Sequence, residues 1–148
     1  MQSGSAGRSL AATLDNDLVT ISIGIDLTSA DAVSASLEAH GTRYLERVYT
    51  VRERRECAQP SGHADPGRLA ARFAAKEATM KALGRDDEPI PWTSIGVSSD
   101  EAGRPSIELT GLAAALARRR GVEELAVSLT HEGQFAAAVV VANVRERI

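Results

Sequence analysis

Glu77 is the residue of this sequence whose position is hardest to explain without chemistry. It lies in Gly67–Leu83, where apolar side chains recur at helical spacing, and a helical wheel places it at the edge of the stripe that contains Leu69 and Phe73. A carboxylate there is partly shielded from water, which costs free energy unless the charge is paired or coordinates a cation. The plainer alternative is a surface ion pair with Lys81, one turn further on, worth roughly 0.2–0.5 kcal/mol.

Asp26 is a second carboxylate of this kind. It lies in the alternating run Leu18–Leu27 (LVTISIGIDL), which has the period-2 pattern of a half-buried strand and puts the isoleucines on one face and Ser22, Gly24 and Asp26 on the other. Taken alone, an aspartate at a strand end is often the cap of the next helix. Brought near Glu77, however, it would favour a hard divalent cation, because magnesium typically uses one or two protein carboxylates with water and substrate phosphates.

His131 is a candidate for contact with a phosphate. It stands in VSLTHEGQFAAAVVV beside an expected hairpin turn, where it is either an exposed turn residue or a hydrogen-bond donor that can shift a proton near neutral pH. His40 and His63 fall in expected surface or loop positions and receive no role. The single Cys57 excludes an intramolecular disulfide framework and has no obvious histidine partner. No Walker-type glycine loop, His-Glu-x-x-His or paired-cysteine motif is present.

The composition limits the classes of protein to consider. With 148 residues, of which 43% are hydrophobic and 25% charged, the chain fits one globular domain with a modest, aromatic-poor core that association would help to stabilise. A net charge of −3 argues against nucleic-acid binding by bulk electrostatics. No apolar run reaches the roughly 18 residues of a membrane span. The lone cysteine favours a reducing, cytoplasmic location.

The elements that must position these residues are a mixture of strands and helices. Residues 1–17, rich in Ser, Gly and Ala, are expected to form a flexible N-terminal extension, and 18–148 a single domain. The expected elements are a strand Leu18–Leu27, a helix from Ser29-Ala30-Asp31 to His40 that stops at Gly41, a helix Val51–Cys57 with a capping box at Thr50 and Glu53, a helix Gly67–Leu83, strands Ser94–Ser99 and Pro105–Leu109, a helix Gly111–Arg120, and a hairpin of Leu125–Thr130 with Gln134–Val144. Because the turns between consecutive strands are too short for parallel crossovers, the sequence predicts an α+β fold with a mostly antiparallel sheet packed against a long helix.

Four motifs occur in a characteristic order. They are GIDL at 24–27, RFAAKEA at 72–78 with KALG at 81–84, GRP at 103–105, and VSLTH at 127–131. In order and spacing this set resembles the holo-acyl-carrier-protein synthases of the 4′-phosphopantetheinyl transferase superfamily. RFAAKEA with KALG is a strong signal by itself, and the resemblance extends from about Ser22 to Ala142.

The resemblance implies an activity, an assembly and a site. The 4′-phosphopantetheine arm of coenzyme A would pass to a serine of an apo acyl carrier protein, with release of adenosine 3′,5′-bisphosphate and with Mg²⁺ as cofactor. The fold would be the compact one of phosphopantetheinyl transferases, assembled as a homotrimer with active sites between subunits. The implied residues are Asp26 and Glu77 as magnesium ligands, Glu77, Lys81 and His131 as catalytic residues, Arg72, Lys81, Gly103, Arg104, Pro105 and His131 on the nucleotide and its phosphates, and Arg43 with Tyr44 on the carrier.

Two stretches depart from the family's pattern. The first helix, in TSADAVSASLEAH, is poor in the basic residues that family members often carry there, and KALG is followed by RDDEPIPW in place of a glycine-rich stretch. Two alternatives therefore stay open, a non-catalytic module that binds coenzyme A or a carrier, and a structural assembly protein. The sequence is compatible with carriers of the fatty-acid, polyketide or peptide-synthetase type, and with free or acylated coenzyme A as the donor. It is also compatible with Glu77 acting directly as the base or through water, and with several roles for the acidic loop Arg85–Glu88.

Overall fold

The computed structural model describes residues 18–84 and 87–146 of the chain. The expected N-terminal extension and the beginning of the acidic loop, Arg85 and Asp86, lie outside the described residues. Along the described chain the elements are β1 Leu18–Ser29, α1 Ala30–His40, α2 Thr42–Val48, α3 Val51–Glu56, α4 Pro66–Leu83, the 3-10 turn η1 Trp92–Ser94, β2 Ile95–Ser99, β3 Pro105–Leu109, α5 Gly111–Arg119, β4 Val122–Glu132 and β5 Phe135–Glu146.

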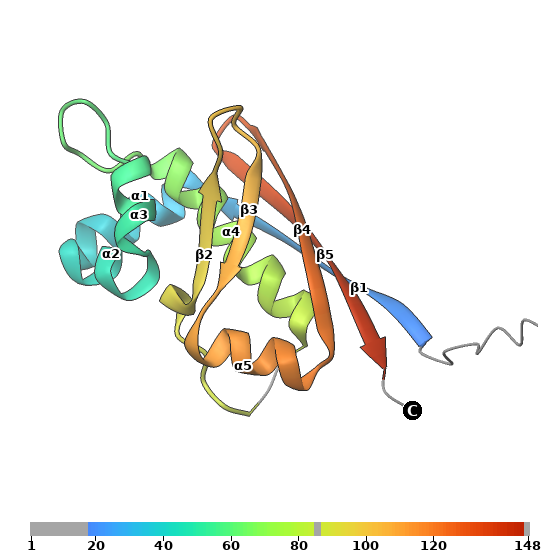
Figure 1. Cartoon of the computed structure of the whole chain (residues 1–148). Coiled ribbons are helices and arrows are strands. Elements are labelled where there is room, and N and C mark those ends of the chain that lie inside the picture. Colours follow the sequence, from blue (N-terminus) through green and yellow to red (C-terminus); the bar gives the residue numbers. More distant parts are fainter. Residues whose placement is uncertain (1–17, 85–86, 147–148) are drawn as a thin grey trace, which may run out of the picture.

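The long helix α4 lies between two antiparallel sheets (Figure 1). On one side is a three-stranded sheet with the order β1-β5-β4, and on the other is the hairpin β2-β3. Alanines of α4 form the main core with alternate residues of β5 and with Val97 of β2. The helices α1–α3 gather around the first turns of α4, and α5 packs near its last turn. The predicted α+β class, antiparallel pairing and central helix are confirmed.

Most helix limits agree with the prediction because the signals that set them are local. Ser29 caps α1, and Thr50 with Glu53 forms the predicted capping box of α3. Helix α4 begins at Pro66, one residue before its predicted start, because Asp65 accepts hydrogen bonds from the first free backbone N–H groups. The sequence patterns do not predict α2, and β4 and β5 are longer than expected. None of the helices in the described part of the chain is long and apolar enough to cross a membrane.

Strand β1 and helix α4 are in direct backbone contact at Gly24. A Cβ atom at this position would overlap Ala78 O and lie 2.8 Å from Ala82 N, so only glycine fits. Nearby on the same face of the strand, the Ser22 hydroxyl donates a 2.7 Å hydrogen bond to Ala82 O. Small residues on both elements therefore bring the helix close to the strand that carries Asp26.

The structure packs the small, polar face of β1 against α4 and leaves its apolar face exposed. The Asp26 side chain is mostly buried, whereas the residues of the opposite face are 62–65% exposed at Ile21, Ile23, Ile25 and Leu27. A contiguous apolar row of this kind is typical of a surface that contacts another protein. The period-2 pattern of the sequence identifies the two faces, but it does not say that the apolar one lies outside.

The buried face of α4 contains a charged residue that helical spacing does not predict to be internal. Lys76 is fully buried, and its Nζ atom lies 2.7 Å from Glu53 Oε1 on α3. Burial lowers the pKa of Lys76, and the neighbouring Glu53 carboxylate opposes that shift. The segment RFAAKEA therefore places one of its charged residues in the core and the next, Glu77, at the edge of the core.

We predict that Gly24→Ala destabilises the fold by about 3 kcal/mol, because the added methyl group must displace the backbone of α4. Gly96→Ala is the matched control: Gly96 is also in a strand, but the nearest neighbour of a Cβ atom there, Glu108 O, would be at 3.5 Å. Urea denaturation followed by circular dichroism gives both free energies of unfolding. Equal stability of the two variants would contradict the close packing of β1 on α4.

Candidate functional site

Asp26 is held near the end of β1 by two polar side chains. Lys81 Nζ lies 3.1 Å from Asp26 Oδ1 and also donates a 2.8 Å hydrogen bond to Ile25 O. Thr28 Oγ1 donates to Asp26 Oδ2 over 3.1 Å. The Asp26 side chain is only 10% exposed, whereas that of Lys81 is 49% exposed. The carboxylate is therefore oriented by a buried hydroxyl group and by an exposed ammonium group.

Glu77 lies one helical turn before Lys81, on the same side of α4. It is half-buried, and the next residue, Ala78, touches β1 at Gly24. The helix therefore places Glu77 along β1, on the side from which Lys81 reaches Asp26. The structure gives Lys81 a partner on β1 that helical spacing alone does not predict, and it gathers Asp26, Glu77 and Lys81 on adjoining elements.

The chemistry of these donors fits a hard divalent cation. Mg²⁺ prefers oxygen ligands and usually takes one or two protein carboxylates together with water and substrate phosphates. Across residues 18–84 and 87–146, no group of three or more His, Cys, Asp or Glu side chains is assembled into a metal site. Asp26 and Glu77 would therefore suit a cation that is shared with a phosphate ligand.

A cavity of about 380 Å³ lies beside the first turns of α4. Its wall includes Arg68 and Arg72 of α4, Thr130 and His131 of β4, and Ala30 at the start of α1. Two guanidinium groups and an imidazole suit an anionic ligand, because guanidinium donors match the geometry of phosphate oxygens. The structure thus brings the predicted residues Arg72 and His131 to one cavity, from elements far apart in the sequence.

Arg72 is nearly buried, and Glu56 of α3 orients its guanidinium group. The Nη2 atom lies 3.1 Å from Glu56 Oε2, and the two side chains are 11% and 25% exposed. Although partial burial opposes the shift, hydrogen bonds from Arg52 and Arg72 hold the pKa of Glu56 below its ordinary value. Arg72 Nε is buried without a hydrogen-bond partner among the described residues. An N–H group left in that state costs about 1–3 kcal/mol, so a bound oxygen ligand or water there would be favourable.

The cavity and the Asp26–Lys81 pair lie along the same helix. Arg72 and Glu77 are five residues apart, which corresponds to about 7.5 Å along the axis of α4. Figure 1 shows the β2–β3 and β4–β5 turns at one end of the molecule, so the predicted segment Gly103–Pro105 lies at the same end as His131. Asp100 Oδ1 fixes this turn by accepting a 2.8 Å hydrogen bond from the backbone N–H group of Arg104. The preceding residue, Gly103, has a φ of 79°, a conformation that suits glycine.

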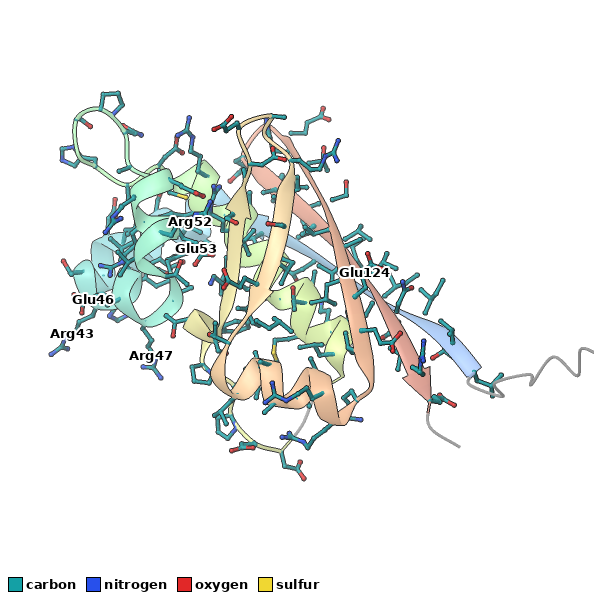
Figure 2. The ribbon with its side chains drawn as sticks, in the orientation of Figure 1. Arg43, Glu46, Arg47, Arg52, Glu53 and Glu124 are labelled. Atoms are coloured by element: carbon teal, nitrogen blue, oxygen red, sulfur yellow. The ribbon has the colours of Figure 1, made fainter. Side chains whose placement is uncertain are left out.

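The two predicted carrier-binding residues differ in their surroundings on α2. Arg43 is exposed and points away from the body of the protein, as Arg47 does (Figure 2). Tyr44 is half-buried: its hydroxyl group lies 3.0 Å from the Tyr49 hydroxyl group, and the two rings pack edge to face with centroids 5.6 Å apart. Arg43 therefore presents its charge to solvent, whereas Tyr44 packs within the α1–α4 cluster.

Three residues of these two regions carry no prediction from the sequence. Thr28 lies two residues after Asp26 on the same strand face, a spacing that could have identified it. Arg68 lies four residues before Arg72 on α4, a helical spacing that could also have identified it. Glu56 lies on α3, and no local pattern connects it to Arg72. Cys57, by contrast, is fully buried, and burial raises the pKa of its thiol to about 11, so it is not a thiolate nucleophile.

Sequence comparison places the chain among phosphopantetheinyl transferases. A model of the 4′-phosphopantetheinyl transferase superfamily matches residues 22–140. The holo-[acyl-carrier-protein] synthase of Paramagnetospirillum magneticum is 42% identical over 125 residues, which cover 82% of this chain and 94% of that protein. The holo-[acyl-carrier-protein] synthase of Moorella thermoacetica is 42% identical over 116 residues, which cover 78% of this chain and 88% of that protein.

Solved structures with the same fold include complexes with coenzyme A. The ACPS-CoA complex from Chronobacterium ammoniagenes has a TM-score of 0.74 at 31% identity, covering 86% of this chain and 99% of its own. The Helicobacter pylori holo-[acyl-carrier-protein] synthase in complex with coenzyme A has a TM-score of 0.68 at 28% identity. The match covers 84% of this chain and 99% of that chain. The described fold is therefore similar to that of coenzyme A-binding synthases over nearly their full length.

We predict that the Glu56–Arg72 ion pair stabilises the fold at neutral pH and is lost in acid. Because the folded-state pKa of Glu56 lies below the ordinary value of 4.5, the stabilisation is complete above that value and disappears as pH falls through the lower folded pKa. Glu56→Gln should be less stable than the wild type by about 1 kcal/mol or less at neutral pH. Urea denaturation at a series of pH values should show that the difference in free energy of unfolding between the wild type and Glu56→Gln becomes smaller in acid. A difference that stays constant with pH would contradict the prediction.

Proposed function

Because the chain belongs to the 4′-phosphopantetheinyl transferase superfamily, we propose that it is a holo-acyl-carrier-protein synthase. It transfers the 4′-phosphopantetheine group of coenzyme A to a serine of an apo acyl carrier protein and releases adenosine 3′,5′-bisphosphate. The names of the relatives and the coenzyme A found in similar structures support this function. The lone Cys57 suits a reducing compartment, and we place the reaction in the cytoplasm.

The observation that carries the proposal is the contact of Lys81 with Asp26, one turn from Glu77. The two carboxylates would supply oxygen ligands to a shared magnesium ion, and Lys81, which is half-exposed beside Asp26, would contact a phosphate oxygen. When bound, Mg²⁺ would neutralise the negative charge that builds up on the leaving phosphate. The enzyme is therefore expected to depend on magnesium.

Transfer exchanges one phosphorus–oxygen bond for another. The serine oxygen of the carrier attacks the phosphorus next to pantetheine, and the bond from that phosphorus to the bridging oxygen breaks, so the electron pair leaves with adenosine 3′,5′-bisphosphate. Glu77 takes the serine proton, either directly or through a water molecule. Lys81 and His131 contact phosphate oxygens, and Arg72 with the segment Gly103–Pro105 holds the nucleotide.

Two further surfaces belong to the proposal. The exposed Arg43 on α2 meets an acidic segment of the carrier, a contact that mainly accelerates encounter and weakens with salt. The apolar face of β1 continues onto β5, where Ile23 pairs with Val141 and Ile25 with Val139. Covering this face with other copies of the chain would remove a large apolar area from water, which supports assembly as a homotrimer.

We predict that Glu77→Gln lowers the rate of transfer about 100-fold or more, because an amide neither accepts the serine proton nor binds magnesium as a carboxylate does. The assay incubates folded protein with magnesium, coenzyme A and a panel of apo carrier proteins. Transfer appears as a mass gain of one phosphopantetheine group on the carrier. Omitting magnesium from the wild-type reaction should also abolish transfer.

Glu108→Gln is the matched control, because Glu108 is an exposed glutamate on β3 and should keep wild-type turnover. No mass gain on any carrier with folded wild-type protein would contradict the transferase and favour a non-catalytic binding module. Wild-type kinetics for Glu77→Gln would instead leave the transferase standing and refute only the role of Glu77.

We also predict that Ile23→Arg prevents assembly, because the Ile23 side chain is 62% exposed on the apolar face and a buried guanidinium group there would have no partner. Light scattering after size exclusion should show a trimer for the wild type and a monomer for the variant. Leu112→Arg, at a 38% exposed leucine on α5, should leave the trimer intact. A wild-type monomer at working concentration would contradict the assembly.

A further inference from the structure

Glu56 has no part in the proposed reaction, yet it holds a residue that lines the cavity. Its carboxylate oxygens lie 3.1 Å from Arg72 Nη2 and 2.9 Å from Arg52 Nε. We propose that Glu56 is a positioning residue, which orients the Arg72 guanidinium group so that its other donors bind a phosphate group of coenzyme A. The inference rests on the proposed function, because it takes coenzyme A as the ligand.

The charges near Arg72 leave room for an anion. Three arginines and two acids lie between α3 and the start of α4. Glu56 pairs with Arg52 and Arg72, and Asp65 pairs separately with Arg68. Three positive and two negative charges leave an excess of one positive charge. His131 on the wall of the cavity adds an imidazole group that can hydrogen-bond an anion. A phosphate group would balance the charge and accept several of the guanidinium N–H groups.

Arg72 depends on a fixed partner more than the neighbouring Arg68 does. The side chain of Arg72 is 11% exposed, whereas that of Arg68 is 61% exposed. Without Glu56 the buried guanidinium group would lose its counter-charge and would turn toward solvent or toward another acid. Within the described residues, Arg72 Nε has no hydrogen-bond partner, so the orientation that Glu56 imposes leaves a donor for a ligand oxygen.

The position of Arg72 along α4 indicates which phosphate it meets. Coenzyme A carries a pyrophosphate and a ribose 3′-phosphate, separated by the ribose ring. Asp26, Glu77 and Lys81 are proposed to take the pyrophosphate, and Arg72 lies about 7.5 Å nearer the start of the helix than Glu77. Arg72 lines a cavity whose wall does not include Asp26, Glu77 or Lys81, so we assign it to the phosphate that these three residues do not take, the 3′-phosphate.

The test measures binding without turnover. Calorimetric titration with magnesium present measures the affinities for coenzyme A and for 3′-dephospho-coenzyme A. Both ligands are titrated into the wild type and into Glu56→Ala. Glu46→Ala, on α2, is the control for the loss of an exposed glutamate. Glu56→Ala should weaken coenzyme A binding about two- to tenfold, the cost of ordering a long side chain anew. The affinity for 3′-dephospho-coenzyme A should be nearly the same in Glu56→Ala as in the wild type. An equal loss of affinity for both ligands would contradict the assignment to the 3′-phosphate, because both ligands carry the pyrophosphate. Glu56→Gln keeps an acceptor oxygen and should therefore lose less affinity for coenzyme A than Glu56→Ala. If Glu56→Ala does not fold, Glu56→Gln takes its place in the test.

The Arg72→Ala background shows whether Glu56 acts through Arg72. There, adding Glu56→Ala should cause no further loss of affinity, because the residue to be oriented is already absent. The inference is overturned by a further loss in that background, by unchanged affinity of Glu56→Ala, or by tighter binding, which would mean that Glu56 competes with the ligand. Wild-type protein that binds neither nucleotide would contradict the proposed function itself, so the two failures are distinct.

Discussion

An ion pair buried between α3 and α4 is the constraint on which the rest of the structure depends. Lys76 Nζ lies 2.7 Å from Glu53 Oε1, and the two side chains are 0% and 1% exposed. The ammonium group also donates hydrogen bonds to Trp92 O and Ile95 O, and Glu53 Oε2 accepts one from Val97 N. Removing one partner of such a pair typically costs about 3–5 kcal/mol, because the other charge stays buried. A single pair of side chains therefore ties two helices, η1 and β2 to one another.

The same pair determines which way α4 faces. With Lys76 directed into the protein, the next residue, Glu77, lies about 100° further round the helix, at the border of the core. Glu56 and Arg72 form a second link between α3 and α4, one turn away from the first on each helix. Rotation of α4 about its axis would break both links. The carboxylate that faces β1 and the arginine that lines the cavity thus keep a fixed relation to each other, although neither link touches the proposed reaction centre.

The parts of this structure that the sequence predicts are those with local signals. Capping residues give the helix limits, and helical and strand spacing single out Glu77 and Asp26. The pairing of Lys76 with Glu53 has no such signal, because tertiary packing chooses among many acids of the chain. The same holds for Glu56 with Arg72. For Tyr44 the resemblance implies a carrier contact, which stays a prediction. The structure adds that its hydroxyl group is hydrogen-bonded to that of Tyr49, a contact that only the packing of α2 reveals.

Strand β1 joins the proposed site to the proposed assembly. Its alternate residues Ser22, Gly24 and Asp26 face α4, and the isoleucines between them face outward. Because side chains alternate along a strand, a shift of one residue in the pairing with β5 would exchange the two faces. Such a shift would drive an isoleucine into the gap that only Gly24 fits and would take Asp26 away from Lys81. The close packing at Gly24 therefore fixes both the carboxylate beside the helix and the apolar surface on the other side.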